Sequence, residues 1–204
     1  MHNNGNYIIS LGNLCRWLSE KAEDLGVEIF PGFSVSDAVY DESGSVIGVV
    51  TGDMGISKSN TRKDSFEPGM ELLAPNIIVA EGARGSLTKK LIKKFKLDKS
   101  SDEPKFGLGL KELWEVDEAK HNLGKVDHFV GWPLDNRTGG GGFMYNLEDN
   151  QISIGFVVHL NYQNPYISPF EEFQKFKTHP KISSILQGGK RVSYGARVIT
   201  EGGL

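Results

Sequence analysis

The stretch FGLGLKELWEV, residues 106–116, decides the fold of this protein. It is an extended apolar segment, and three more follow it at residues 126–132, 141–147 and 152–160. Each of these segments is bounded by Gly, Pro, Asn or Asp. Extended segments separated by such turn residues are typical of antiparallel strands. We therefore predict an antiparallel sheet beyond Pro104.

A helix and a final strand are predicted after this sheet. Ser168 and Pro169 are typical of a helix start, and the following Pro180 ends the helix. Three phenylalanines form its apolar stripe: Phe170, Phe173 and Phe176. Residues 192–199 are predicted as the final strand.

A helix and a hairpin are predicted before the sheet. From Leu11 to Leu25 apolar residues recur with a period of about 3.6, which predicts an amphipathic helix, and Gly26 suits a left-handed cap. Residues 27–30 are predicted as a short strand. Two further strands, at 34–40 and 46–51, are joined by the turn DESG and predict a hairpin.

The segment between the hairpin and the sheet divides into three parts. Residues 54–69 are polar, without sustained periodicity, and are predicted as a surface loop. The apolar residues 72–73 and 77–80 form a nearly continuous run, which predicts a strand covered on both faces. A helix follows from Leu87, and its lysines, between residues 89 and 96, are interpreted as a solvated face rather than a membrane contact.

The composition restricts the classes of function. The 204 residues, of which 38% are hydrophobic, suffice for one or two domains. A formal net charge of −3 without a basic block argues against nucleic acid as a partner. The single Cys15 excludes an internal disulfide and holds neither a structural zinc nor an iron–sulfur cluster, so we expect no metal site here. We also expect neither a membrane span nor an export signal.

Two glycine-containing stretches are candidate ligand sites. AEGARG, residues 80–85, follows an apolar run and precedes a helix, where small residues admit a nucleotide phosphate or ribose, or simply allow close packing. The run TGGGG, residues 138–142, lies between GWPL and the apolar FMY, so it is either a linker or a place where backbone approaches a flat ligand. Composition does not choose between these alternatives.

The histidines form no catalytic pattern. His128, His159 and His179 lie on unrelated segments, and neither His-Glu-x-x-His nor Gly-x-Ser-x-Gly occurs. We therefore expect no catalytic acid–base residue in this chain, and neither a hydrolase nor a metalloenzyme is supported.

Three groups of strings together resemble the electron-transfer flavoprotein-ubiquinone oxidoreductase family. They are FGLGLKELW at 106–114, VDH with GWPLD between 126 and 135, and NYQNPY with SPF between 161 and 170. Their order and spacing match as well. The strings YIISLG at 7–12, GGKR at 188–191, YGAR at 194–197 and EGG at 201–203 extend the likeness over essentially the whole chain.

The resemblance implies an FAD enzyme with one 4Fe-4S cluster that passes electrons from reduced electron-transfer flavoprotein to ubiquinone. It implies a peripheral location, on the mitochondrial inner membrane or the bacterial cytoplasmic membrane. It also puts the dinucleotide fingerprint before Met1 and the cluster cysteines after Leu204. We therefore expect an internal fragment that has no turnover of its own.

The resemblance further implies a fold of the α+β and α/β classes. Residues 1–100 are expected to form part of an FAD-binding Rossmann-like domain, and residues 101–190 an antiparallel-sheet ubiquinone-binding domain. Residues 191–204 are expected to form a strand that returns to the FAD domain.

Site residues are also implied by the resemblance. The family's quinone site uses backbone groups of a glycine pair that matches Gly140 and Gly141, with an apolar wall at Phe143. An aromatic residue often precedes that pair in the family, whereas Gly139 stands here, so we expect a looser pocket mouth.

An FAD contact is implied in the first part of the chain. The turn formed by Ala80, Glu81 and Gly82 resembles the family's contact near the adenosine half of FAD. The strand at Ser34 and Val35 is expected to lie beside the adenine.

Two alternatives stand beside this function. One is a truncated, noncatalytic module that binds quinone or a membrane. The other is a flavoprotein of the geranylgeranyl reductase type with the same two-domain plan, against which the strings GWPLD and YQNPY argue.

Overall fold

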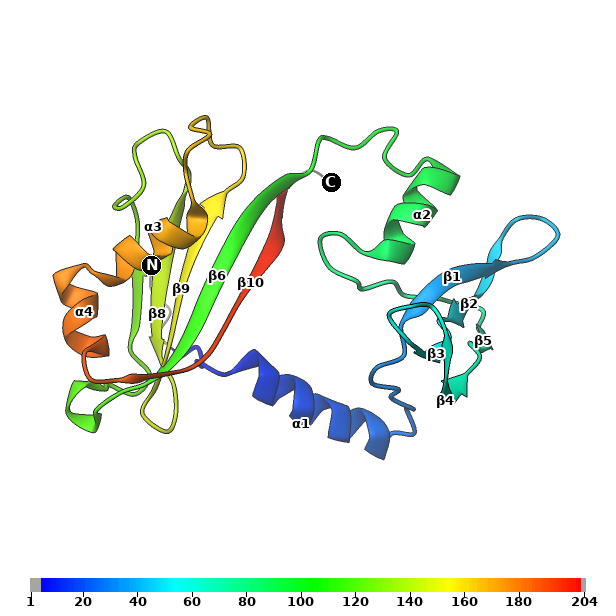
Figure 1. Cartoon of the computed structure of the whole chain (residues 1–204), viewed down its shortest axis with the longest axis horizontal. Helices are drawn as coiled ribbons and strands as arrows, with labels where there is room; N and C mark the ends of the chain where they lie inside the picture. The colour runs from blue at the N-terminus through cyan, green and yellow to red at the C-terminus, as the bar shows by residue number, and fades with distance from the viewer. Residues whose placement is uncertain (1–4, 203–204) are drawn as a thin grey trace. The chain divides into compact units, whose positions relative to one another are not determined.

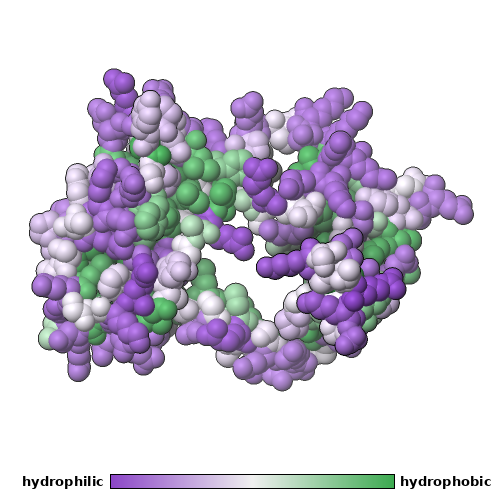
Figure 2. Space-filling view, viewed as in Figure 1, coloured by the Kyte–Doolittle hydropathy of each residue, from purple (hydrophilic) through white to green (hydrophobic). Residues whose placement is uncertain are grey.

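The computed structural model describes residues 5–202 (Figure 1). Its internal contacts separate two compact units. The large unit comprises Met1–Lys21 together with Asp102–Leu204, and the small unit comprises Ala22–Ser101. Hydrophobic surface is visible on each unit among mostly hydrophilic surroundings (Figure 2).

The large unit is built on a five-stranded antiparallel sheet, as predicted. The strand order is β10-β6-β9-β8-β7. The strands are β6 (Lys105–Glu115), β7 (Val126–Phe129), β8 (Gly140–Asn146), β9 (Gln151–His159) and β10 (Lys190–Gly202). A short 3-10 helix, η1 (Glu118–Lys120), precedes β7. β10 pairs with β6 over almost its whole length, from Lys190 opposite Glu115 to Gly202 opposite Lys105.

Two helices, α3 (Pro169–Lys177) and α4 (Pro180–Leu186), pack with this sheet (Figure 1). The predicted start of α3 is confirmed, because the Ser168 hydroxyl accepts a hydrogen bond from the Glu171 amide. Helix α4 was missed. The predicted stop at Pro180 is correct for α3, but proline also suits the first turn of a helix, and here it begins α4.

The core of the large unit lies between the sheet and these helices. Alternate residues of β9 point into it, and Phe156 and Ile154 are completely buried. The Phe176 ring of α3 lies 5.1 Å from that of Phe156 and 5.2 Å from that of Phe129. Phe173 is buried as predicted, whereas Phe170 is 59% exposed and does not belong to the apolar stripe.

Helix α1 (Leu11–Asp24) confirms the first predicted helix. Gly26 follows it in the left-handed region, with φ of +84°, as its position after the helix predicted. None of the residues of α1 is buried. Among the described residues, no helix has the length and apolar character needed to cross a membrane.

The small unit contains short antiparallel sheets and one helix. Strands β1 (Val35–Tyr40), β2 (Val46–Thr51) and β5 (Glu71–Leu73) form a sheet in the order β1-β2-β5, and the predicted hairpin is confirmed. Strands β3 (Met54–Ile56) and β4 (Arg62–Glu67) form a separate pair. Helix α2 (Ser86–Phe95) begins where predicted.

Three predictions for the small unit are wrong. Residues 27–30 form no strand. Residues 54–69 are not a loop but the β3–β4 hairpin, whose turn has Asn60 in the left-handed region and is closed by hydroxyls that polarity alone did not reveal. The apolar run is a strand only at β5, and Ile78 is 93% exposed, since nothing in the described small unit covers it.

The structure thus agrees with the expected mixture of helices and antiparallel sheets. The Rossmann-like assignment and the domain boundaries at 100/101 and 190/191 stay predictions, and the outermost residues, 1–4 and 203–204, lie outside the described part of the chain.

A buried carboxylate connects three elements of the large unit. Glu112 of β6 has a side chain only 3% exposed, and it accepts hydrogen bonds from Lys177 Nζ of α3 at 2.8 and 2.9 Å. It also accepts from Trp114 Nε1 at 2.8 Å and from Arg191 Nη1 of β10 at 3.2 Å. Burial raises the pKa of Glu112, but the hydrogen bonds from Lys177 and Trp114 outweigh burial, and the pKa lies below its ordinary value.

We predict that Glu112→Gln lowers the free energy of unfolding by about 3 kcal/mol at pH 7, because it leaves the Lys177 ammonium without its carboxylate in a largely buried site. Urea unfolding followed by tryptophan fluorescence measures this loss. Because the folded-state pKa is lowered, the stabilisation is present above the unfolded pKa and is lost as the pH falls through the folded one. The difference from wild type should therefore shrink below about pH 4.

The matched control is Glu115→Gln, at an exposed position of the same strand. It should change the free energy of unfolding by less than about 0.5 kcal/mol. Equal losses in the two variants would contradict the assigned role of Glu112.

Candidate functional site

The glycine run of residues 139–142 lies at the start of β8, between β7 and β9. Gly140 is opposite Val158 of β9, and Gly141 is opposite Val157. The pairing with β7 reaches only from Val126 to Phe129, which is opposite Gly142. Gly140 and Gly141 therefore continue past the end of the β7 ladder, and their backbone is paired along β9.

The run is an ordered strand and not a linker. A side chain at Gly142 would overlap the ring of Phe176, and one at Gly141 would overlap the carbonyl oxygen of Phe129. Gly140 has φ of +148°, a backbone conformation that L side chains rarely adopt. Glycine is thus required here by close packing and backbone conformation, which excludes the linker, while the approach of a flat ligand stays a prediction.

The side of the sheet away from α3 and α4 is called the glycine face. Gly141 and Phe143 of β8 and Gly155 and Val157 of β9 lie on it, because strand residues alternate between the two faces. A Cβ at Gly155 would overlap the Phe143 ring, so this ring lies directly over the bare backbone of β9. The result is an aromatic ring beside glycine backbone, on a face that these helices do not cover.

Two polar residues with aromatic rings, Tyr145 and His128, lie next to Phe143 on this face. The Tyr145 ring lies 4.8 Å from that of Phe143, and its hydroxyl lies 3.1 Å from Nε2 of His128 on β7. Of the three residues implied by the resemblance, Gly141 and Phe143 lie on the face that carries this aromatic cluster, which the sequence did not indicate. Gly140 lies on the opposite face, where an added Cβ would be 2.7 Å from the Leu134 side chain.

The position before the glycine pair is also occupied. The structure places the imidazole of His159 over Gly139, where a Cβ would be only 2.8 Å from Nδ1. The space expected to loosen the pocket mouth is filled by this ring. Sequence analysis missed His159 because Gly139 and His159 meet only through strand pairing, and no local pattern signals such a contact.

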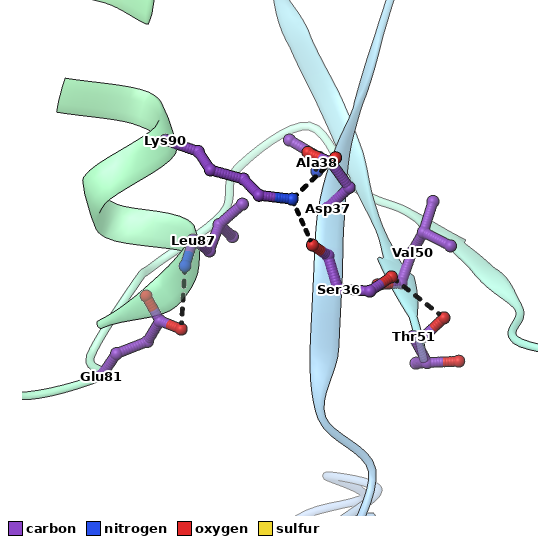
Figure 3. Close-up of polar contacts among 8 residues, drawn as sticks. All are labelled: Ser36, Asp37, Ala38, Val50, Thr51, Glu81, Leu87 and Lys90. Carbon is purple, nitrogen blue, oxygen red and sulfur yellow. Dashed lines mark hydrogen bonds and ion pairs between the residues drawn. The ribbon is translucent and has the colours of Figure 1, made fainter. Parts of the chain in front are cut away.

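The second group of predicted residues lies in the small unit, and Figure 3 shows one of them, Glu81, at the start of α2. The Glu81 carboxylate accepts hydrogen bonds from the amides of Leu87 at 3.2 Å and Thr88 at 2.7 Å, at the start of α2. The Thr88 hydroxyl donates a third, at 2.8 Å. The bond from the Thr88 amide is the main cause of the lowered pKa of Glu81. Ala80 and Gly82, on either side of Glu81, are exposed.

Ser34 and Val35 are placed at the start of β1. Val35 is opposite Thr51 of β2, and the Ser34 carbonyl accepts a hydrogen bond from the Gly52 amide at 2.8 Å. Helix α2 is joined to β1 by Lys90, whose Nζ donates to the Ser36 carbonyl at 2.8 Å and lies 2.9 Å from Asp37 Oδ2 (Figure 3).

These residues do not fit a complete FAD. The amides at the start of α2 are the natural place for a phosphate, but Glu81 already occupies them. Ala80 and Gly82 are exposed, and their contact with the adenosine half of FAD stays a prediction. For the cluster, the described residues contain no group of three or more His, Cys, Asp or Glu that could hold a metal, and Cys15 is the chain's single cysteine.

Comparison with known proteins gives a family match over the part of the chain that contains the glycine run. Residues 106–199 match the family model described as "ETF-QO, ubiquinone-binding". The chain is 53% identical to the electron transfer flavoprotein-ubiquinone oxidoreductase of Pseudomonas aeruginosa, covering 100% of this chain and 37% of the relative. It is also 53% identical to the mitochondrial protein of that name from Mus musculus, covering 100% of this chain and 33% of the relative. The chain therefore spans about a third of the length of these relatives.

Solved structures share the fold at low sequence identity. The flavin-dependent brominase Bmp2 matches with a TM-score of 0.57 and 12% identity, over 96% of this chain and 44% of that chain. A triple mutant of the same brominase matches with a TM-score of 0.59 and 11% identity, over 93% of this chain and 43% of that chain. At such identity the likeness concerns the fold alone.

We predict that Gly155→Ala lowers the free energy of unfolding by about 1–3 kcal/mol, because the new methyl group displaces the Phe143 ring from the glycine face. Thermal unfolding measures the loss, and the ring-proton NMR signals of Phe143 and Tyr145 should shift together. Gly195→Ala on β10 is the control, since nothing lies within 4 Å of its added Cβ. If Gly155→Ala is as stable as this control, the packing of Phe143 on β9 is not as described.

Proposed function

The chain belongs to the electron transfer flavoprotein-ubiquinone oxidoreductase family, as its sequence strings predicted, and we propose that its glycine face binds the ubiquinone headgroup. The observation that carries this proposal is the position of Gly140 and Gly141 beyond the end of β7, with Phe143 next to them on the glycine face. This segment lies inside the matched residues 106–199.

The proposed site suits the chemistry of a quinone. A quinone headgroup is flat and largely apolar, and it needs a slot with one or two hydrogen bonds to its carbonyl oxygens. Backbone groups of the Gly140–Gly141 segment that face the side beyond the end of β7, where β7 no longer pairs with them, would supply such donors, and glycine lets a flat ring approach them. The Phe143 ring supplies an apolar wall with which a second ring can stack in an offset arrangement.

In the complete enzyme, we propose, this site receives electrons that come from reduced electron-transfer flavoprotein. FAD and a 4Fe-4S cluster would carry the electrons, and their chemistry belongs to segments of the relatives that this chain does not match. We propose that five residues of the small unit contact the adenosine half of FAD in a Rossmann-like domain: Ser34, Val35, Ala80, Glu81 and Gly82. The enzyme would sit peripherally on the mitochondrial inner membrane or the bacterial cytoplasmic membrane.

A noncatalytic quinone-binding module is the second candidate for the chain as it stands. It is favoured by the small unit, where Glu81 occupies the amides that a phosphate would need. Binding of quinone without turnover would distinguish this candidate from a complete enzyme.

Titration of the ¹⁵N-labelled chain with a short-tailed ubiquinone should shift the amide signals of Gly140 and Gly141 first. Phe143→Ala should raise the Kd about tenfold, because one stacking wall is lost. Phe170→Ala is the matched control, since this ring is 59% exposed and lies on α3, and it should leave the Kd unchanged. Substitution of Gly141 itself is less informative, because a side chain there would overlap Phe129.

Shifts confined to residues outside the glycine face would contradict the proposed site. Equal effects of the two phenylalanine variants would show that the apolar wall is elsewhere.

A further inference from the structure

An imidazole and a carboxylate form a pair at the same end of the sheet as the glycine run. Nε2 of His159, at the end of β9, lies 3.0 Å from Oε2 of Glu201 on β10. The side chain of His159 is 44% exposed and that of Glu201 is 21% exposed. The pair borders a cleft of about 730 Å³ that Glu103, Lys105, Phe106 and Asn161 also line.

Two glycines make room for this pair. A Cβ at Gly107 of β6 would overlap the Glu201 carboxylate, and a Cβ at Gly139 would lie 2.8 Å from Nδ1 of His159. The His159 amide also donates to the Gly139 carbonyl at 3.0 Å, so the backbone ladder continues to this point. The ring is therefore held from two sides, by the carboxylate and by the flat backbone of Gly139.

Strand register puts His159 beside the proposed quinone site. Gly141 is opposite Val157, so Gly139 and His159 are the next pair on the same face. Residues two apart on a strand are separated by about 6.8 Å. On the glycine face, the pair Gly141 and Val157 thus lies between Phe143 and His159.

The hydrogen bond that Nε2 makes determines whether Nδ1 of His159 donates or accepts a hydrogen bond. With the Nε2 proton donated to Glu201, the neutral ring has only a lone pair at Nδ1, whereas the protonated ring has an N–H there. A carboxylate partner of this kind fixes the orientation and tautomer of an imidazole. Nδ1, which lies at Gly139, is consequently a donor only in the protonated ring.

We propose that His159, positioned by Glu201, donates from Nδ1 to one carbonyl oxygen of the bound quinone and supplies one of the two protons that its reduction needs. This inference rests on the proposed function. Reduction adds two electrons, which come from the reduced flavoprotein, and two protons. One O–H bond forms as the Nδ1–H bond breaks, the second proton comes from solvent, and the exposed ring then takes a proton back from water.

The charged side chains that line the cleft with His159 are Glu201, Glu103 and Lys105. Glu201 contacts Nε2 from β10, while Glu103 and Lys105, on the segment entering β6, line the same cleft. These two are tested separately by Glu103→Gln and Lys105→Gln. Both line the cleft, whereas Glu201 is the carboxylate that contacts the His159 ring, so each substitution should leave the pH dependence of quinone binding in place.

The test uses the 204-residue chain and a short-tailed ubiquinone, with Kd measured by NMR between pH 8.5 and 5.5. Binding should strengthen about tenfold as the pH falls, which corresponds to one hydrogen bond from a charged donor. His159→Gln should abolish this pH dependence, while the Gly140 and Gly141 amides still shift at saturation. His179→Gln, at the start of α4, is the matched control and should keep it.

Gly139→Ala gives a second variant that keeps His159 itself. The added methyl group should push the ring aside, so the pH dependence should vanish as in His159→Gln, and the double variant should show no additional loss. The ring ¹⁵N signals of His159 should move on quinone addition in wild type and stay unchanged in Gly139→Ala.

The outcomes separate the two proposals. A wild-type chain whose Gly140 and Gly141 signals do not respond to quinone overturns the proposed function, and this inference with it. A wild-type chain that binds at those glycines, with unchanged affinity and pH dependence in His159→Gln, overturns the role of His159 alone.

Discussion

The large unit depends on the close approach of Phe176 to the backbone of β8. Its ring lies where a Cβ of residue 142 would be, and it contacts the rings of Phe129 and Phe156. This contact brings α3 onto the middle of the sheet, and it requires glycine in the strand despite the entropic disadvantage of that residue. Because residues alternate along β8, fixing Gly142 on the helix side also fixes Gly141 and Phe143 on the other side.

The candidate site is a consequence of that alternation. Glycines recur on the uncovered face at positions where a ring or a carboxylate from a neighbouring strand takes the space of the missing Cβ: Phe143 at Gly155, His159 at Gly139 and Glu201 at Gly107. The missing side chain at each of these glycines thus lets a neighbouring ring or carboxylate lie directly on the backbone. We propose that a quinone binds on this face because a flat ligand needs backbone donors and an apolar wall, which the end of β8 and the Phe143 ring would supply.

In the small unit, a side chain of the protein itself occupies amides that could otherwise bind a ligand. The start of α2 offers amides of the kind that bind phosphate, but Glu81 from the preceding turn satisfies them, and these bonds lower its pKa. Lys90 then connects this helix to β1 through Asp37 and the Ser36 carbonyl. A phosphate at this place would have to displace a carboxylate that already makes good hydrogen bonds.

Local patterns in the sequence determined most of the elements and the family. Helix α1, the β1–β2 hairpin, the start of α3 and the antiparallel strands follow from periodicity, capping residues and turn residues, and the long strings around GWPLD and YQNPY identified the relatives. These features depend on residues close together in the chain. The tertiary structure alone decided that β3 and β4 pair, that Pro180 starts another helix, and that residues 78–80 stay exposed. It alone brought Glu112 to Lys177 and His159 to Gly139, because strand register and helix packing decide which distant side chains meet, and a one-dimensional pattern contains no record of register.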